Sequence, residues 1–192
     1  MKPKDYRVRA VACHHEASEQ ETYEALVRAT DPLTEAWERL GKASRIGIKI
    51  NHDKPVDRWV FHKGMLQQLV CDKVVRATLR LLRERTTAHI ICTDVSFYGM
   101  YQDTDPLETG TALPSLRDYD VEYVVGSQAE TKVYPVPGGG QMFAQYLLPS
   151  PAMEVDEFIS LAKMKNHAFM GITLSLKNLF GLMPGEPRGH TR

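Results

Sequence analysis

Two lysines and a histidine alternate near the C-terminal end of this 192-residue sequence. Lys163, Lys165 and His167 close the segment V-D-E-F-I-S-L-A-K-M-K-N-H, whose middle is apolar. If a strand runs to its end, the three side chains project on one side, because strand side chains alternate. Two ammonium groups can hold an anion, and an imidazole can move a proton near neutral pH. The segment predicts an anion site with His167 and Lys165 as catalytic candidates. A pair of solvated lysines at a strand end is the alternative.

The next segment, T-L-S-L-K-N-L-F-G, adds further polar side chains. At helical spacing Lys177 shares a face with Thr173, and Asn178 shares one with Ser175. The apolar stripe of this helix is Ile172, Leu176, Leu179, Phe180 and Met183. Lys177 and Asn178 are therefore candidates to bind the same ligand.

An earlier strand, expected over 44–51, carries two more candidates. Its isoleucines take one face, and Lys49 and Asn51 share the other beside a glycine. An amphipathic helix over 65–85, against which the isoleucine face should be buried, and a strand over 88–95 should follow. With the first strand they form a parallel crossover unit. In such sheets ligands bind outside the carboxyl ends of the strands. We therefore expect Lys49 and Asn51 to face the same cleft as Lys163. Because a buried lysine needs a counter-charge, either an external anion or a distant acid such as Asp94 should neutralise it.

The remaining patterns predict the fold class: α/β, with a mostly parallel or mixed sheet, flanking helices and an incomplete C-terminal end. We expect a single domain over 1–192 with a long loop or small lobe at about 96–120. The other expected elements are a strand over 8–13, helices over 18–29, 31–41 and 171–180, strands over 121–126, 141–148 and 158–165, and a turn over 135–140.

The composition limits the kinds of binding partner and the location that can be expected. Lys and Arg number 24 and so do Asp and Glu, a neutral balance that argues against a nucleic-acid partner. From Lys163 onward five basic residues face one acidic residue, which suits a small anion better than a polyanion. No window has the ~20 apolar residues of a membrane span, and no apolar stretch follows the first residues. No membrane contact and a cytoplasmic location are expected.

Metal and cluster sites are not expected in this chain. The three cysteines, Cys13, Cys71 and Cys92, are too dispersed to hold an iron–sulfur cluster. The histidines His14, His15 and His52 show no ligand spacing typical of zinc sites. The run P-V-P-G-G-G lacks the spacing of a phosphate-binding glycine loop.

The combined motifs resemble a known family. The run L-A-K-M-K-N-H, followed by T-L-S-L-K-N-L-F-G-L-M-P-G and R-G-H, resembles the signature of the domain of unknown function 362 family. The earlier I-G-I-K-I-N is similar to that family's strand motif, which Lys49 and Asn51 match. The resemblance implies an α/β domain often found beside ferredoxin-like four-iron–four-sulfur modules, and no established reaction. This sequence lacks cluster-binding cysteines and ends just after the signature, so a fragment or a shortened member is expected.

Two functional hypotheses follow. In the first, the chain binds a small carboxylate or phosphate in a Lys/His/Asn-lined cleft, in an enzyme or a redox-linked domain. In the second, it is a non-catalytic module that docks a ferredoxin-type partner. Any four-iron–four-sulfur cluster would then lie in that partner or in a missing region. The sequence does not decide whether the protein is an enzyme.

Overall fold

The run R-I-G-I-K-I forms the central strand of a four-stranded parallel sheet. The computed structural model describes residues 8–51, 59–94, 113–126 and 128–183. The sheet has the order β5-β4-β1-β8, and all three pairings are parallel. Its strands are β1 (Arg45–Ile50), β4 (His89–Asp94), β5 (Glu122–Val125) and β8 (Glu157–Leu161). Beyond its first residue, β1 is buried throughout, as expected for a parallel strand covered on both faces.

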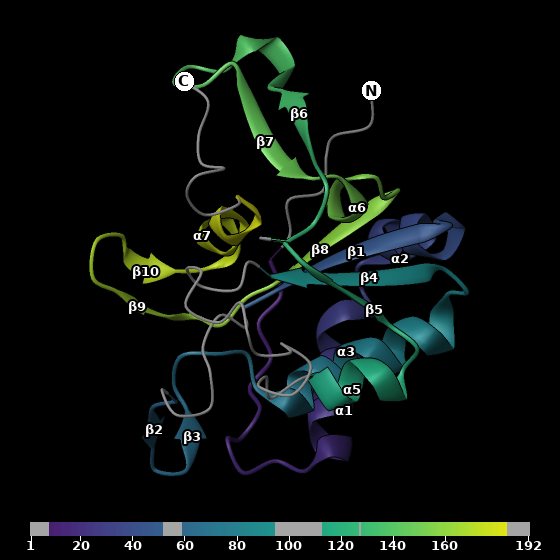
Figure 1. Cartoon of the computed structure of the whole chain (residues 1–192). Coiled ribbons are helices and arrows are strands. Elements are labelled where there is room, and N and C mark those ends of the chain that lie inside the picture. The colour runs from purple at the N-terminus through teal and green to yellow at the C-terminus, as the bar shows by residue number, and fades with distance from the viewer. Residues whose placement is uncertain (1–7, 52–58, 95–112, 127, 184–192) are drawn as a thin grey trace.

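One face of the sheet packs against helices. The three isoleucines of β1 lie in a core cluster with Val75, Leu79 and Leu82 of α3. Figure 1 shows α1, α3 and α5 in one layer on this side. The helices are α1 (Glu19–Thr30), α2 (Thr34–Lys42), α3 (Asp72–Arg85) and α5 (Leu113–Asp118). This packing confirms the predicted burial of the isoleucine face.

The opposite face is covered by the C-terminal half of the chain. There, α6 contacts β1 and β4, α7 contacts β1 and β8, and η3 contacts β4. These elements are α6 (Ser150–Met153), α7 (Ser175–Leu179) and η3 (Phe180–Leu182). A Cβ at Gly47 would lie 2.8 Å from the ring of Phe158, so the glycine makes room for this aromatic side chain of β8.

Three antiparallel hairpins extend from this framework (Figure 1). In the first, Lys63 and Gly64 both have positive φ, which is the requirement of a two-residue type I′ turn. The hairpins pair β2 (Phe61–His62) with β3 (Met65–Leu66), β6 (Thr131–Pro135) with β7 (Gln145–Pro149), and β9 (Lys165–His167) with β10 (Gly171–Thr173). The turn η2 (Pro137–Gly139) joins β6 to β7. The fold is therefore α/β, as the sequence predicted. No helix in the described part of the chain is long and apolar enough to cross a membrane.

Several boundaries in the first half were wrong. Residues 8–13 form no strand. The helix expected from residue 65 begins at Asp72, because the β2–β3 hairpin occupies the earlier residues. The second helix begins at Thr34, since Asp31 instead ends α1 by donating its backbone N–H to the Val27 carbonyl. The helix expected over 18–29 is confirmed as α1, and its start carries the sequence pattern and the hydrogen bonds of a capping box between Ser18 and Glu21.

The C-terminal half also differs from expectation. The strand expected over 158–165 ends at Leu161, and the chain then forms β9 in a separate hairpin. The helix expected from Gly171 begins only at Ser175, because 171–173 pair with β9. The strand expected from residue 141 begins at Gln145. Most of the loop expected over 96–120 lies outside the described residues, and its last part is helix α5. A single domain over 1–192 stays a prediction.

Candidate functional site

The Lys49 ammonium is a deeply buried charge that lies between the sheet and the C-terminal elements α7 and η3. Its Nζ lies 2.6 Å from Asp94 Oδ1, and both side chains are only 2% exposed. It also donates to the Ile50 carbonyl at 2.6 Å and to Asn178 Oδ1 at 3.3 Å. Removing both charges from water is costly unless they are paired and hydrogen-bonded. Asp94 therefore neutralises Lys49, which is the internal alternative that the sequence left open.

The Asn178 side chain joins α7 to two strands of the sheet. Its Nδ2 donates to the Lys49 carbonyl at 2.9 Å and to Ser160 Oγ at 3.1 Å. The Ser160 hydroxyl donates in turn to the Ser175 carbonyl at the start of α7. Because Lys49 and Ser160 are register partners on β1 and β8, one buried amide fixes α7 over both strands. Sequence reasoning missed Ser160, although a serine inside the apolar run F-I-S-L was a usable signal.

Gly181 brings the η3 backbone against this ion pair. A Cβ at this position would lie 2.8 Å from Lys49 Nζ and 2.9 Å from Asp94 Oδ1. Gly181 directly follows the helix expected over 171–180, and it lies inside η3. Its role here is close approach, because only a residue without a side chain leaves space for the Lys49–Asp94 pair.

The strand order places a topological switch point between β1 and β8. From β1 the chain crosses through α3 to β4 on one side, whereas β8 joins the sheet on the other. Ligands of open α/β sheets bind outside the carboxyl ends of strands at such a point. The last register pair there is Ile50 with Leu161. Asn51, which is buried, and Lys163, which is half-buried, follow these two strand ends.

The other predicted site residues have separate surroundings. Lys165 donates to the backbone carbonyl of Gln68. The Lys177 ammonium lies 4.5 Å from the centre of the Phe180 ring. His167 Nδ1 accepts from the backbone N–H groups of the residues two and three positions later, at 3.2 and 3.3 Å. The hairpin that carries Lys165 and His167 connects β8 to α7.

The structure thus brings Lys49 into contact with Asn178, and it places Asn51 and Lys163 after the same two strands. Lys163, Lys165 and His167 do not alternate along one strand, because β8 ends before the first of them. Within the described part of the chain, Lys163 and Lys177 have no carboxylate at ion-pair distance. A shared ligand for the whole set stays a prediction.

Burial in the sheet beneath the site shifts the pKa values of two acid–base groups. Burial, followed by the negative charge of Asp94, raises the pKa of the Cys92 thiol far above its ordinary value. Burial also raises the pKa of Tyr123. Both groups are therefore neutral at physiological pH, and Cys92 is not a thiolate nucleophile.

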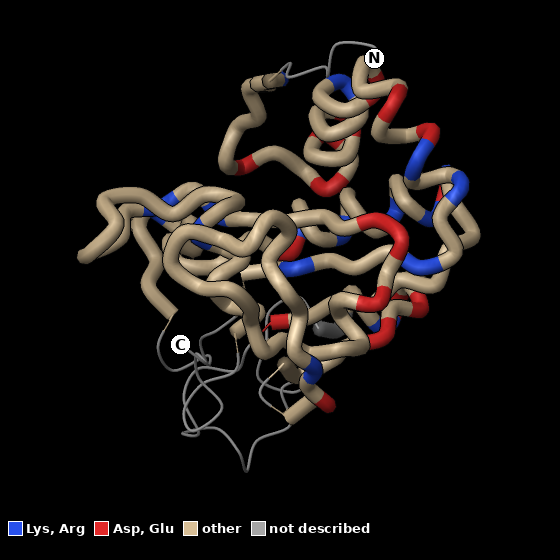
Figure 2. The backbone as a smooth tube through the Cα atoms, turned by 90° about the horizontal axis from the view of Figure 1, so that it is seen from above, with Lys and Arg blue, Asp and Glu red and all other residues tan. Residues whose placement is uncertain are grey.

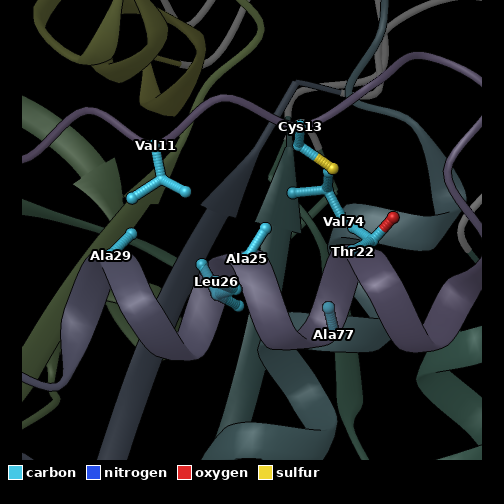
Figure 3. Close-up of a pocket in the computed structure, with 8 residues that line it drawn as sticks. All are labelled: Val11, Cys13, Thr22, Ala25, Leu26, Ala29, Val74 and Ala77. Atoms are coloured by element: carbon cyan, nitrogen blue, oxygen red, sulfur yellow. The ribbon is translucent and has the colours of Figure 1, made fainter.

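A cavity of about 190 Å³ lies on the other side of the molecule, where residues 11–13 cross helix α1 (Figure 3). Its lining is apolar apart from one thiol and one hydroxyl: Val11, Cys13, Thr22, Ala25, Leu26, Ala29, Val74 and Ala77. It therefore offers no charge to an anion and is separate from the β1–β8 switch point.

These features define an open, parallel α/β domain in which a buried asparagine holds a C-terminal helix over the two strands that flank the switch point. The model of the domain of unknown function DUF362 matches residues 48–192, which is more than half of the chain, so the protein belongs to that family. A 44-residue segment is 43% identical to the thylakoid-associated protein sll1697 of Synechocystis sp. (strain ATCC 27184 / PCC 6803 / Kazusa). This segment covers 23% of the present chain and 14% of that protein, well under two thirds of its length. No solved structure matches the chain.

Proposed function

We propose that this DUF362 domain binds a small anion, a carboxylate or a phosphate, in the crevice where β1 and β8 end. One observation carries the proposal. Residues 158–183 border this switch point and contain three lysines and a histidine but no acidic residue. Figure 2 shows the same asymmetry: the part of the backbone around the β9–β10 hairpin, at the left of the view, has basic positions and no acidic ones. A local excess of basic over acidic residues at a strand edge favours an anionic ligand.

The roles follow from position. Lys163 and Lys177 supply charge, because neither has a carboxylate partner among the described residues. The Asn51 amide provides a hydrogen-bonding group at the end of β1. Lys49 and Asn178 form the fixed wall of the site, since Asp94 already neutralises the lysine. His167 and Lys165 are the proposed acid–base pair, because their hairpin connects the two elements that border the crevice.

The anion proposal can be tested by thermal unfolding in phosphate, succinate and citrate at matched ionic strength. A ligand that binds the folded state alone raises the melting temperature in a saturable way. We expect saturation for at least one anion and a weaker response in the Lys163→Ala and Lys177→Ala variants. Lys132→Ala is the control, because Lys132 lies on the distant β6–β7 hairpin and already pairs with Glu154, which follows helix α6. Equal, unsaturated responses in all four proteins would argue against the site.

A second function is favoured by exposed apolar side chains on the β9–β10 hairpin and α7. Phe169 is 93% exposed and Leu176 is 86% exposed. The other large hydrophobic residues exposed there are Met164, Met170, Ile172, Leu174 and Phe180. An exposed apolar patch of this kind usually marks an interface, and the neighbouring lysines select an acidic partner. The family's association with iron–sulfur modules makes a ferredoxin-type protein the proposed partner, which would carry any four-iron–four-sulfur cluster.

Ferredoxin docking and anion binding depend on different side chains of the same region. An acidic ferredoxin should bind in a salt-sensitive manner, and Phe169→Ser with Leu176→Ser should weaken it while leaving anion binding unchanged. Val133→Ser is a matched control, because Val133 is half exposed on β6, away from the apolar surface. Retained ferredoxin affinity in the double variant would contradict the docking surface.

A further inference from the structure

Three potential metal ligands converge on the turn before helix α1. The ligand atoms of His14, His15 and Glu16 all lie within 4.8 Å of one another. The two imidazole rings are 4.3 Å apart between centroids. Each imidazole has a nitrogen 3.9 Å from a Glu16 carboxylate oxygen. Sequence reasoning rejected a metal site at these two histidines, because no carboxylate or cysteine lies at the ligand spacing of common zinc motifs.

Several contacts hold this turn in place. The Ala17 N–H donates to the His14 carbonyl at 3.0 Å, and the Glu16 N–H donates to His14 Nδ1 at 3.3 Å. The buried Ala17 accepts a hydrogen bond from Lys73 of α3 through its carbonyl. The capping box that follows at Ser18 fixes the start of α1. The three ligands therefore project from a turn whose C-terminal side is anchored by Ala17 and Ser18.

We propose that His14, His15 and Glu16 bind a divalent transition-metal ion. Imidazole nitrogens suit zinc, copper and nickel, and a carboxylate oxygen is an accepted third ligand. Tetrahedral ligands about 2.1 Å from one ion lie about 3.4 Å from each other, so these exposed side chains need to close by up to about 1.4 Å. All three are exposed, which leaves water to complete the coordination shell.

The neighbouring thiol is not counted among the ligands. Cys13 lines the apolar cavity beside α1, and Figure 3 shows its side chain directed toward that cavity. The metal site is also separate from the proposed anion site, which lies at the carboxyl ends of β1 and β8. The proposal therefore does not depend on the proposed function.

The test is calorimetric titration with Zn²⁺ of the full chain, without an affinity tag and after removal of metals by chelation. We expect one Zn²⁺ per chain and weaker binding at lower pH, because protons compete for the imidazoles. His14→Ala, His15→Ala and Glu16→Gln should each weaken binding by about tenfold or more. Cys13→Ser should leave the affinity unchanged.

The matched control is His89→Ala. His89 and Glu122 form an exposed histidine–carboxylate pair with 2.7 Å between Nε2 and Oε2, but among the described residues no third ligand joins them. We expect wild-type affinity in this variant. The proposal is overturned if Zn²⁺ does not bind, if the His14→Ala, His15→Ala double variant keeps its affinity, or if binding depends on Cys13 or His89 instead.

Discussion

Replacing Lys49 by methionine is the most informative perturbation of the structural core of the site. The change keeps the length of the side chain but removes the ammonium. Asp94 would then stay 2% exposed without the group that lies 2.6 Å from it. Breaking a buried ion pair in this way usually costs about 3–5 kcal/mol of folding free energy, because the charge that stays buried loses its counter-ion. Lys49→Met should destabilise the protein by that amount.

A surface ion pair provides the matched control. Arg39 Nε lies 3.0 Å from Glu157 Oε1, but the arginine side chain is 60% exposed. Because water screens such a pair, Arg39→Ala should cost no more than about 1 kcal/mol. The comparison separates the effect of burial from the effect of losing a salt bridge.

Urea unfolding followed by circular dichroism measures both changes as a shift in midpoint at constant slope. The double variant Lys49→Met, Asp94→Leu should recover most of the lost stability, since apolar replacement of both partners is often neutral. A Lys49→Met loss below about 1 kcal/mol, or a double variant as unstable as the sum of the single changes, would refute the argument.

Three further predictions concern single positions. Gly181→Ala should cost about 1–3 kcal/mol by crowding the Lys49–Asp94 pair. Gly41→Ala in helix α2, where an added Cβ would lie 3.9 Å from the Arg85 carbonyl oxygen of α3, should instead stabilise by up to about 1 kcal/mol; equal losses in a denaturant titration would refute the contrast. Because the folded state raises the pKa of Cys92 above its ordinary 9.0, its contribution is full below pH 9 and is lost as pH rises. Stability should therefore fall between pH 9 and 10 by up to about 1.4 kcal/mol per pH unit, and Cys92→Ala should flatten this slope; an unchanged slope would show that the thiol is not responsible. Ser18→Ala should cost about 1 kcal/mol by removing the cap of α1, and a midpoint shift near zero would contradict that role.

Local patterns were sufficient where local physics decides the structure. The alternation in I-G-I-K-I correctly predicted a strand with isoleucines on the α3 face and Lys49 on the other. The Ser18 capping box correctly predicted the start of α1. In both cases the determining contacts lie within a few residues or on one packed face.

The site required contacts that the sequence does not display. Asp94 is separated from Lys49 by a whole helix, and only the parallel pairing of their strands brings the two charges together. The alternation of Lys163, Lys165 and His167 was misleading, because β8 ends at the edge of the sheet and the chain turns into a hairpin. Such an ending depends on tertiary packing, which local residue preferences do not determine.

The measurement that tests the central claim most directly is an amide NMR titration of the full chain with the anion that gives the largest thermal shift. The account predicts saturable shifts at Asn51, Ser160, Lys163 and Asn178, which surround the carboxyl ends of β1 and β8. The amides of the β6–β7 hairpin should not move. Shifts confined to that hairpin, or none that saturate, would contradict anion binding at the switch point.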